Sequence, residues 1–266
     1  MPYAYAWFLD AVSPQWEALI TDNYEFVMPL PVKRKFGIKY VILPRWTQQL
    51  GVFSAQPVSH EIIHRFLAKI PYLSYDFNLN FANVYGSKLP NSIISLQQPY
   101  ETIYKQFTQN TRRNIAKAEK AKLNIQTIDN QDLIDFWRSQ NRDKAQELSD
   151  KLPNLCKAAV EQNTGHCYGV YTIDNELIAT LMTLETPQRI IYLVPTSNRQ
   201  GKELCAMFFL VNELLKTHAG ENRVFDCEGS RIPGVARFYA GFGAQPQPYF
   251  TVKRCRPQWL VKLINR

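Results

Sequence analysis

The sequence has few cysteines, and their positions exclude the common cysteine-based architectures. Its five cysteines are scattered through the second half of the 266 residues, at positions 156, 167, 205, 227 and 255. None forms a C-x-x-C pair, and an odd number argues against a closed disulfide framework. Cys167, Cys205 and Cys227 stand in apolar contexts, which is typical of small, buried core residues.

Long apolar runs are also missing. No stretch approaches the about 20 apolar residues that cross a bilayer, and residues 1–10 lack the basic start and cleavage pattern of a signal peptide. We therefore expect a cytoplasmic protein. Apolar residues make up 45% and charged residues 20%, which excludes a disordered chain. At this length two domains are expected.

The charge is unevenly balanced, with 31 Lys and Arg against 23 Asp and Glu, a net charge of +8. Such an excess favours anionic partners such as phosphates, coenzyme A, nucleotide-linked sugars or RNA. A basic, solvated surface would give the same total, so the charge alone does not choose a function.

The first part of the chain alternates short apolar runs with turn residues. We expect strands over 25–30 and 39–43, joined by a basic turn over 31–37. The apolar spacing predicts a helix over 61–70, which Pro71 ends. Two further short strands are expected over 73–78 and 92–96, and from Pro99 the pattern becomes helical and strongly basic.

The second part has a different order of elements. A hairpin is expected over 167–185, with its turn at 174–176, followed by a strand over 189–194. The polar loop 195–202 leads to a helix from Glu203 to about His218. After this helix come a buried strand over 223–227, a helix over 234–242 and a strand over 249–254.

The helix over 234–242 carries the most specific motif. Ala236, Phe238, Tyr239 and Gly243 follow an Ala-x-x-aromatic-Tyr pattern with a glycine four residues after the tyrosine. Together with the element order, this resembles the core of the GNAT acyltransferases. The resemblance implies that Tyr239 donates a proton to the leaving group, a role for which a phenol that is protonated at neutral pH is suited. The alternative is an amphipathic helix whose tyrosine only packs.

The polar loop resembles the GNAT segment that binds the coenzyme pyrophosphate at a helix start, where unpaired N–H groups attract anions. Gly201 matches that motif and Asn198 matches it in part, with Arg199 and Lys202 beside them. Glu203 departs from it, because a carboxylate repels a bound pyrophosphate. We therefore expect no tightly bound cofactor. A coenzyme A thioester remains open as donor.

Residues 104–118 and 225–236 resemble a second branch, the FemABX-type acyltransferases. This branch contains two GNAT-like halves and moves an aminoacyl group from tRNA to an amine of a peptidoglycan precursor. The resemblance covers about residues 100–254 and implies an anionic substrate: tRNA, a nucleotide-linked peptidoglycan precursor or a coenzyme A thioester. The long helical hairpin of some FemABX members is absent from the sequence.

Two basic pairs are candidates for binding such a substrate. Arg112 and Arg113 lie in the FemABX-like segment, and guanidinium groups bind phosphate oxygens in two places. Lys33 and Arg34 lie in the expected basic turn. In both cases the alternative is a solvated basic surface.

Asp226 and Glu228 are the candidate acceptor-side catalytic residues. They are two apart on an expected strand, so they should face the same side. There they could orient or deprotonate an acceptor amine. Otherwise one of them only accepts a hydrogen bond from the loop that follows.

One motif points to a different class of enzyme. His60-Glu61-Ile62-Ile63-His64 has the H-E-x-x-H spacing of a zinc hydrolase. Ile70 occupies the place where zincins put a third histidine, so we expect no metal site and a surface helix instead.

The sequence thus predicts an α/β protein with mixed sheets and two GNAT-like units. The first is a degenerate half over 1–99, and the second is a half over 100–266 with the active-site motifs. The predicted function is N-acyl transfer, with acyl or aminoacyl donors open. The alternatives are a non-catalytic protein that binds an anionic ligand and, more remotely, a zinc hydrolase.

Overall fold

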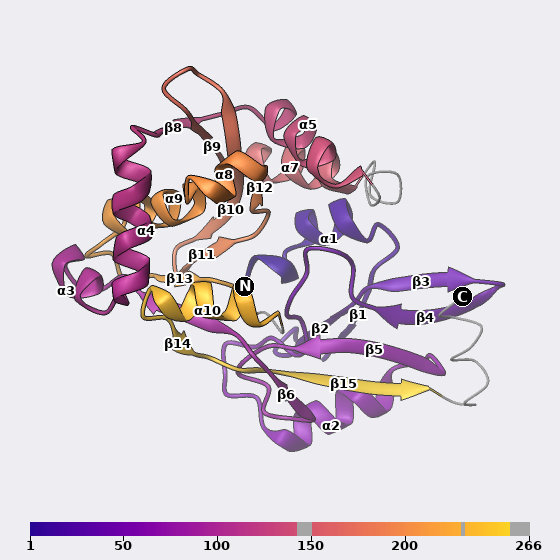
Figure 1. Ribbon diagram of the computed structural model, residues 1–266. Helices are drawn as coiled ribbons and strands as arrows, with labels where there is room; N and C mark the ends of the chain where they lie inside the picture. Colours follow the sequence, from indigo (N-terminus) through magenta and orange to yellow (C-terminus); the bar gives the residue numbers. More distant parts are fainter. Residues whose placement is uncertain (143–150, 230–231, 256–266) are drawn as a thin grey trace. The chain divides into compact units, whose positions relative to one another are not determined.

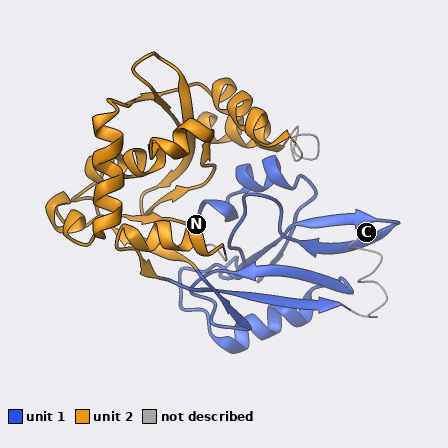
Figure 2. Ribbon diagram, in the orientation of Figure 1, with its two compact units in different colours: residues 1–90, 247–266 blue, residues 91–246 orange. Residues whose placement is uncertain are grey.

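The computed structural model describes residues 1–142, 151–229 and 232–255. It forms two compact units (Figure 2), one of residues 1–90 and 247–266, and the other of residues 91–246. This division differs from the predicted one, which had a single boundary at residue 99. The second unit begins at residue 91, and residues 247–266 belong to the first unit. Residues 92–95 pair within the second unit, whereas the strand over 249–255 pairs within the first. Hydrogen bonding between strands, and not distance along the chain, sets these units.

The described part of the first unit contains two sheets, two α-helices and a short 3-10 helix. Its elements are η1 (Pro2–Ala4), α1 (Ala6–Val12), β1 (Glu17–Ile20), β2 (Val27–Leu30), β3 (Val32–Lys35), β4 (Ile38–Ile42), α2 (His60–Lys69), β5 (Ser74–Leu79), β6 (Ser87–Leu89) and β15 (Tyr249–Cys255). Strands β1 and β2 form a small antiparallel sheet, and the second sheet has the order β3-β4-β5-β15-β6. Ile63, Phe66 and Leu67 of α2 are buried in the core of this unit.

The predicted basic turn over 31–37 is a strand followed by a much shorter turn. Val32–Lys35 forms β3 and pairs with β4, with Lys35 opposite Ile38. Only Phe36 and Gly37 turn the chain, with φ of 50° and 79°. Positive φ at both central residues matches the twist of hairpin strands. All four residues of β3 can therefore pair with β4 up to the turn.

The second unit is a mixed sheet covered by helices (Figure 1). Its elements are β7 (Ser92–Ser95), α3 (Tyr100–Lys105), α4 (Gln109–Lys120), β8 (Asn124–Thr127), α5 (Asn130–Gln140), α7 (Lys151–Glu161), β9 (Gly165–Tyr171), β10 (Leu177–Thr186), β11 (Arg189–Tyr192), β12 (Thr196–Ser197), α8 (Arg199–Glu203), α9 (Ala206–Thr217), β13 (Val224–Asp226), α10 (Pro233–Gly241) and β14 (Gln245–Pro246). The strand order is β14-β7-β13-β11-β10-β9-β8, with β12 on β10. Among the described strands of this sheet, only β11 and β13 run parallel to each other.

The predicted fold class is confirmed: both units are mixed α/β structures. The predicted hairpin corresponds to β9 and β10, and the predicted helices over 61–70 and 234–242 correspond to α2 and α10. Within the described ranges no helix is both long enough and apolar enough to span a bilayer.

Candidate active site

The carboxyl end of β13 carries a buried ion pair. The Asp226 side chain is fully buried, and one of its oxygens accepts a hydrogen bond from Nη1 of Arg189. Arg189 opens the neighbouring strand β11 and is itself buried, with an exposed fraction of 6%. A buried charge needs a partner of opposite sign and further hydrogen bonds. Arg189 and Asp226 therefore compensate each other's charge in the interior of the second unit.

Asp226 also holds the backbone of Glu228, two residues beyond the end of the strand. Its Oδ1 accepts a hydrogen bond from the backbone N–H of Glu228 at 3.0 Å. The φ of Glu228 is 53°, a left-handed conformation that a non-glycine residue rarely adopts. Because β13 ends at Asp226, the predicted alternation that would place both carboxylates on one face of a strand is wrong. Asp226 faces Arg189, whereas the half-buried Glu228 lies beyond the strand end.

Tyr239 lies on α10 in the core of the second unit. Its exposed fraction is 8%, and its ring is in T-shaped contact with Tyr192 of β11 at 6.0 Å between centroids. Burial raises the pKa of the Tyr239 hydroxyl, and the nearby charges of Glu228 and Asp226 raise it further. The phenol is therefore held in its protonated form close to two carboxylates.

A groove of about 370 Å³ lies between β12, α8 and the start of α9. Its lining includes Thr196, Lys202, Cys205, Phe208 and Phe238 of α10, whose ring lies 5.7 Å from the Tyr239 ring, while Tyr239 is not among the lining residues. The Thr196 hydroxyl is buried and has no hydrogen-bond partner among the described residues. An unpaired buried hydroxyl is costly, so this group is suited to bind a ligand in the groove.

The four residues predicted to bind a phosphate come together at α8, and three of them have partners within this segment. Asn198 caps the helix, and its Oδ1 accepts the backbone N–H of Gly201 at 2.8 Å. Gly201 is buried against the carbonyl of Ile178, where a Cβ atom would clash. Nε of Arg199 pairs with Oε1 of Glu203 at 2.8 Å, and Lys202 lines the groove.

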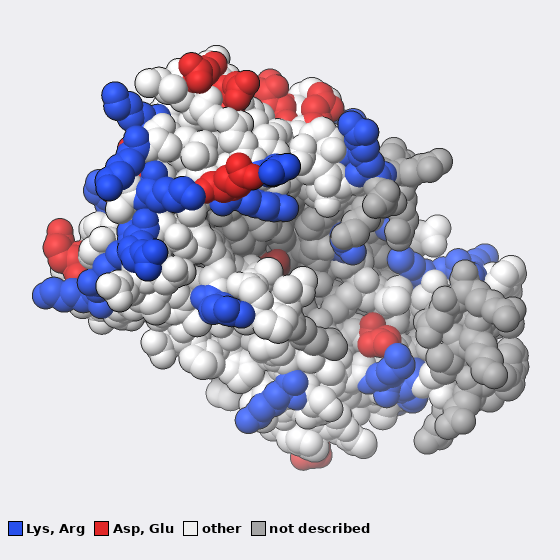
Figure 3. All heavy atoms as spheres, viewed as in Figure 1, with Lys and Arg blue, Asp and Glu red and all other residues white. Residues whose placement is uncertain are grey.

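Arg112 and Arg113 occupy different environments on α4. Nη2 of Arg112 donates to the backbone carbonyls of Tyr104 and Lys105 at 3.2 and 2.9 Å, and its guanidinium lies 5.1 Å from the centre of the Tyr104 ring. It therefore caps the carboxyl end of α3, where a cation is favourable. Arg113 is exposed and has no ion-pair partner among the described residues. Lys and Arg side chains gather over α4 in Figure 3.

The other predicted residues lie in the first unit. Lys33 and Arg34 are on β3, and Arg34 stands opposite Lys39 of β4. His60 and His64 both contact Tyr85: the His60 ring lies 4.5 Å from the Tyr85 ring, and Nδ1 of His64 is 3.0 Å from the Tyr85 hydroxyl. Across the described part of the chain, no three His, Cys, Asp or Glu side chains are grouped to hold a metal ion.

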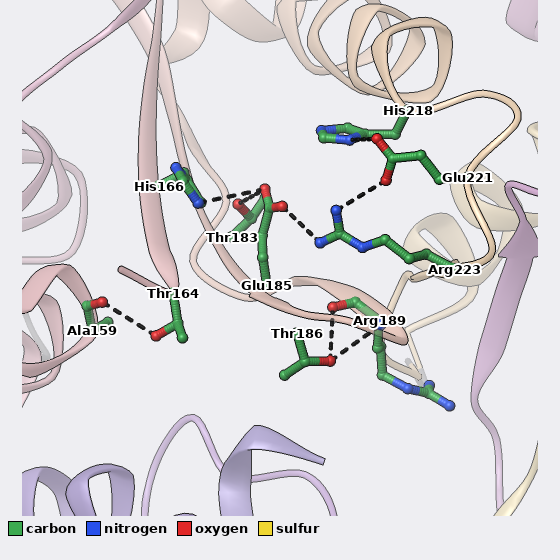
Figure 4. Close-up of polar contacts among 10 residues, drawn as sticks. All are labelled: Ala159, Thr164, His166, Thr183, Glu185, Thr186, Arg189, His218, Glu221 and Arg223. Carbon is green, nitrogen blue, oxygen red and sulfur yellow. Dashed lines mark hydrogen bonds and ion pairs between the residues drawn. The ribbon is translucent and has the colours of Figure 1, made fainter. Parts of the chain in front are cut away.

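A second polar cluster in the second unit joins several elements (Figure 4). The Arg223 guanidinium donates to Glu185 at 2.7 Å and to Glu221 at 3.0 Å, and Glu221 contacts Nδ1 of His218 at 2.9 Å. Burial alone would raise the pKa of Glu221, but the hydrogen bonds from His218 and Arg223 lower it. This cluster ties β10 and the end of α9 to the start of β13, which supports the strand that carries Asp226.

Comparison with known proteins gives a consistent result at the level of fold. Scans against family models and against curated proteins find no match. Among solved structures, FemX is 10% identical with a TM-score of 0.64, covering 94% of this chain and 91% of its own. L-PGS from Bacillus licheniformis is 11% identical with a TM-score of 0.58, covering 94% and 87%. A tandem GNAT protein from the clavulanic acid biosynthesis pathway is 10% identical with a TM-score of 0.53, covering 86% and 78%.

The chain has a tandem GNAT-like fold. The similarity to FemX confirms the predicted likeness of fold to that branch. At identities near one residue in ten the similarity establishes the fold and leaves the substrates open, so the residue roles remain to be argued from the site.

Three residues of this site were not predicted from the sequence. Arg189 enters it through its bond to Asp226 of β13, Tyr192 through its ring contact with Tyr239 of α10, and Thr196 through the pairing of β12 with β10. Arg189 had a detectable signal, because a charge at the start of an apolar strand requires a buried partner. The Tyr192 and Thr196 side chains had none, since both residue types are common in strands.

Proposed function

We propose that this protein is an N-acyltransferase that moves an acyl or aminoacyl group onto an amine, with its chemistry in the second unit. The observation that carries the proposal is the cluster at the end of β13. Asp226 is held by Arg189 and fixes the backbone of Glu228, and a protonated Tyr239 lies near both carboxylates. The fold, shared with acyltransferases, supports the same reaction class.

Each residue has a distinct role in this reaction. The amine attacks the carbonyl carbon of the donor, a C–N bond forms, and the bond to the leaving oxygen or sulfur breaks. Glu228 accepts the proton that the amine loses, and the Tyr239 hydroxyl gives its proton to the leaving atom. Asp226 already binds Arg189 and the Glu228 N–H, so it is a positioning residue and not the base.

The geometry of α8 favours an ester donor over a coenzyme A thioester. The Gly201 N–H, which a pyrophosphate would need, is taken by Asn198, and Glu203 adds a carboxylate to the same short helix. A raised pKa for Tyr239 also matches a basic oxygen leaving group better than a thiolate. We therefore infer an aminoacyl ester such as aminoacyl-tRNA as donor. The inferred acceptor is an amine of a nucleotide-linked peptidoglycan precursor.

The first test compares donors and the proposed base. Purified protein is incubated with radiolabelled aminoacyl-tRNA or acyl-coenzyme A and with amine acceptors that include nucleotide-linked peptides. We expect transfer from aminoacyl-tRNA, and a loss of about 100- to 10,000-fold in turnover for Glu228→Gln. Glu119→Gln, an exposed carboxylate of α4, is the matched control and should keep full turnover. Transfer from acyl-coenzyme A that does not change in Glu228→Gln would refute both the donor and the base.

A second candidate function is the binding of an anionic ligand without catalysis. The self-capped α8 and its Glu203 favour it, because they depart from the segment that positions a coenzyme. A ligand that binds only the native state raises the melting temperature. Stabilisation by a nucleotide-linked peptide without any detectable transfer would support this second candidate.

A further inference from the structure

Strand β1 of the first unit has an edge that no described strand covers. It pairs with β2 alone, in a register that places Ile20 opposite Val27 and Ala18 opposite Pro29. The N–H and C=O groups of Val27 both bond to Phe53, at 2.9 and 2.8 Å, so they face away from β1. Bonded and non-bonded positions alternate along an antiparallel pair. The N–H and C=O groups of Ala18 and Ile20 therefore point away from β2.

These outward groups are available to a strand from outside. In the part of the chain that the structure describes, neither residue has a backbone partner on this edge, and both are exposed, Ile20 at 49%. An open edge is a template for a further strand, and proteins usually protect it with a charge or a proline. Alanine and isoleucine give no such protection.

The open edge borders a groove of about 480 Å³, a size that is typical of ligand sites. Its lining includes Leu19 and Ile20 of β1, together with Arg65, Phe66 and Lys69 of α2. Phe66 belongs to the core of the first unit and Leu19 packs against that core. The groove therefore combines a strand edge, apolar side chains held by the core and the face of a helix.

The helix side of this groove is positively charged. Arg65 and Lys69 lie one turn apart on α2, and both are exposed and without an ion pair among the described residues. Like charges at this spacing destabilise a helix. No Asp or Glu belongs to the described lining. Glu61 and Asp22 are near in sequence, but both are exposed and neither forms an ion pair with the two cations. Two positive charges are therefore left for an acidic ligand.

These features together select a peptide over other anionic ligands. Outward N–H and C=O groups need a partner with its own backbone donors and acceptors, which a fatty acid or an inorganic phosphate does not offer. The chain's own residues 256–266 include Arg256, Lys262 and Arg266 and no acid, so their charge opposes that of the groove.

We propose that β1 and α2 form a binding site for an extended segment of a partner protein that carries apolar and acidic side chains. The segment adds as a strand to β1, and its backbone bonds Ala18 and Ile20. Its apolar side chains enter the groove, and an acidic side chain pairs with Arg65 and Lys69. In such strand addition the main-chain hydrogen bonds supply affinity and the side chains supply specificity. This site lies in the first unit and is independent of the acyl-transfer reaction.

Binding of synthetic peptides to the intact protein tests this site by fluorescence anisotropy. Peptides of about eight residues alternate glutamate with valine, leucine or tyrosine. We expect binding of at least one of them that weakens with salt, and binding about tenfold weaker when lysine replaces glutamate. Methyl groups on every second peptide nitrogen remove the donors from one edge of the peptide. One of the two alternate methylation patterns should weaken binding by about tenfold, and the other should not.

Variants of the protein assign the contacts. Arg65→Gln and Lys69→Gln should each weaken the glutamate peptide by about two- to fivefold. Lys88→Gln is the matched control, since it removes an exposed cation of β6 that does not line the groove, and it should leave affinity unchanged. Ala18→Pro removes an outward N–H and keeps the bonds to β2, because proline is tolerated where the N–H faces solvent. It should weaken binding by about three- to tenfold.

A melting control shows whether Ala18→Pro folds, and the methylated peptides report on the same edge in the intact protein if it does not. Four outcomes would overturn the proposal. They are no binding of any glutamate peptide up to about 1 mM, equal binding of both methylation patterns, and an affinity that neither Arg65→Gln nor Lys69→Gln changes. The fourth is self-association that Ala18→Pro abolishes in the absence of peptide binding, which would make the edge a contact between two copies of the chain.

Discussion

At the scale of single residues, the environment of Tyr239 sets the conditions for its proposed chemistry. The hydroxyl is buried beside Tyr192 and close to two carboxylates, so its ionised form is strongly disfavoured. Such a group cannot lose its proton to water at neutral pH, but it can give it to a more basic anion that forms next to it. An alkoxide leaving group is such an anion, whereas a thiolate depends less on the proton.

Tyr239→Phe should therefore lower turnover by about 100- to 10,000-fold while leaving the melting temperature close to that of the intact protein. Only one hydroxyl is lost, and the ring contacts remain. Tyr40→Phe provides the control, because it removes a hydroxyl from an equally buried ring in the first unit, which holds none of the groups assigned to the reaction. Turnover and thermal unfolding are measured side by side. Full activity in Tyr239→Phe would show that this tyrosine only packs in the core.

At the scale of elements, two adjacent arginines of α4 lie in different environments. Arg112 bonds two carbonyls at the end of α3, so it supports the angle at which α4 leaves that helix. Arg113, one position further on, turns its side chain to solvent. Adjacent positions on a helix point about 100° apart, which is why the two arginines of one sequence motif lie in different environments.

We expect Arg112→Ala to lower the free energy of unfolding by about 1–2 kcal/mol, through loss of the helix cap and of contact with Tyr104. Arg113→Ala should change stability by less than about 0.5 kcal/mol and instead weaken binding of a phosphate-bearing substrate by about 1–3 kcal/mol. Urea unfolding and a binding titration on both variants measure the two effects. Equal stability losses would assign both arginines to the fold, and unchanged affinity in Arg113→Ala would remove it from the substrate site.

The elements also show what sequence patterns can and cannot predict. The α2 and α10 helices have regular apolar spacing and clear start signals, and both were placed to within about one residue at their beginnings. The segment over 195–202 was expected as a polar loop, but it forms β12 and most of α8. Its pairing with β10 and the Asn198 cap depend on contacts that no local pattern reveals.

The same limit applies to the site residues. Tyr239 could be named from its helix motif, but the role of Asp226 could not. The alternation of side chains along a strand predicted that Asp226 and Glu228 face the same side. The strand ends between them, and Asp226 forms an ion pair with Arg189. Side-chain partners across a sheet are set by tertiary pairing, which overrides strand periodicity at strand ends.

At the scale of the whole molecule, the end of the chain returns to the unit in which the chain begins. Strand β15 lies between β5 and β6 in the first unit, with Val252 opposite Phe77 and Thr251 opposite Ser87. Without β15, β6 would lose its pairing partner and β5 would become an edge strand. The larger sheet of the first unit is therefore incomplete without β15. A single boundary along the sequence does not describe the two units for this reason.

A substitution that weakens β15 should therefore destabilise strands that lie more than 150 positions away in the sequence. Val252 is 7% exposed in the core of the first unit, so Val252→Ser should cost about 2–3 kcal/mol by removing apolar contacts and burying a hydroxyl. Lys253→Ser, on the opposite face and 60% exposed, should cost less than about 1 kcal/mol because it breaks only a surface ion pair with Asp76. Hydrogen exchange should then show reduced protection of β5 and β6 in Val252→Ser alone, with β9 and β10 unchanged. Protection lost only within residues 91–246 would contradict this division of the chain.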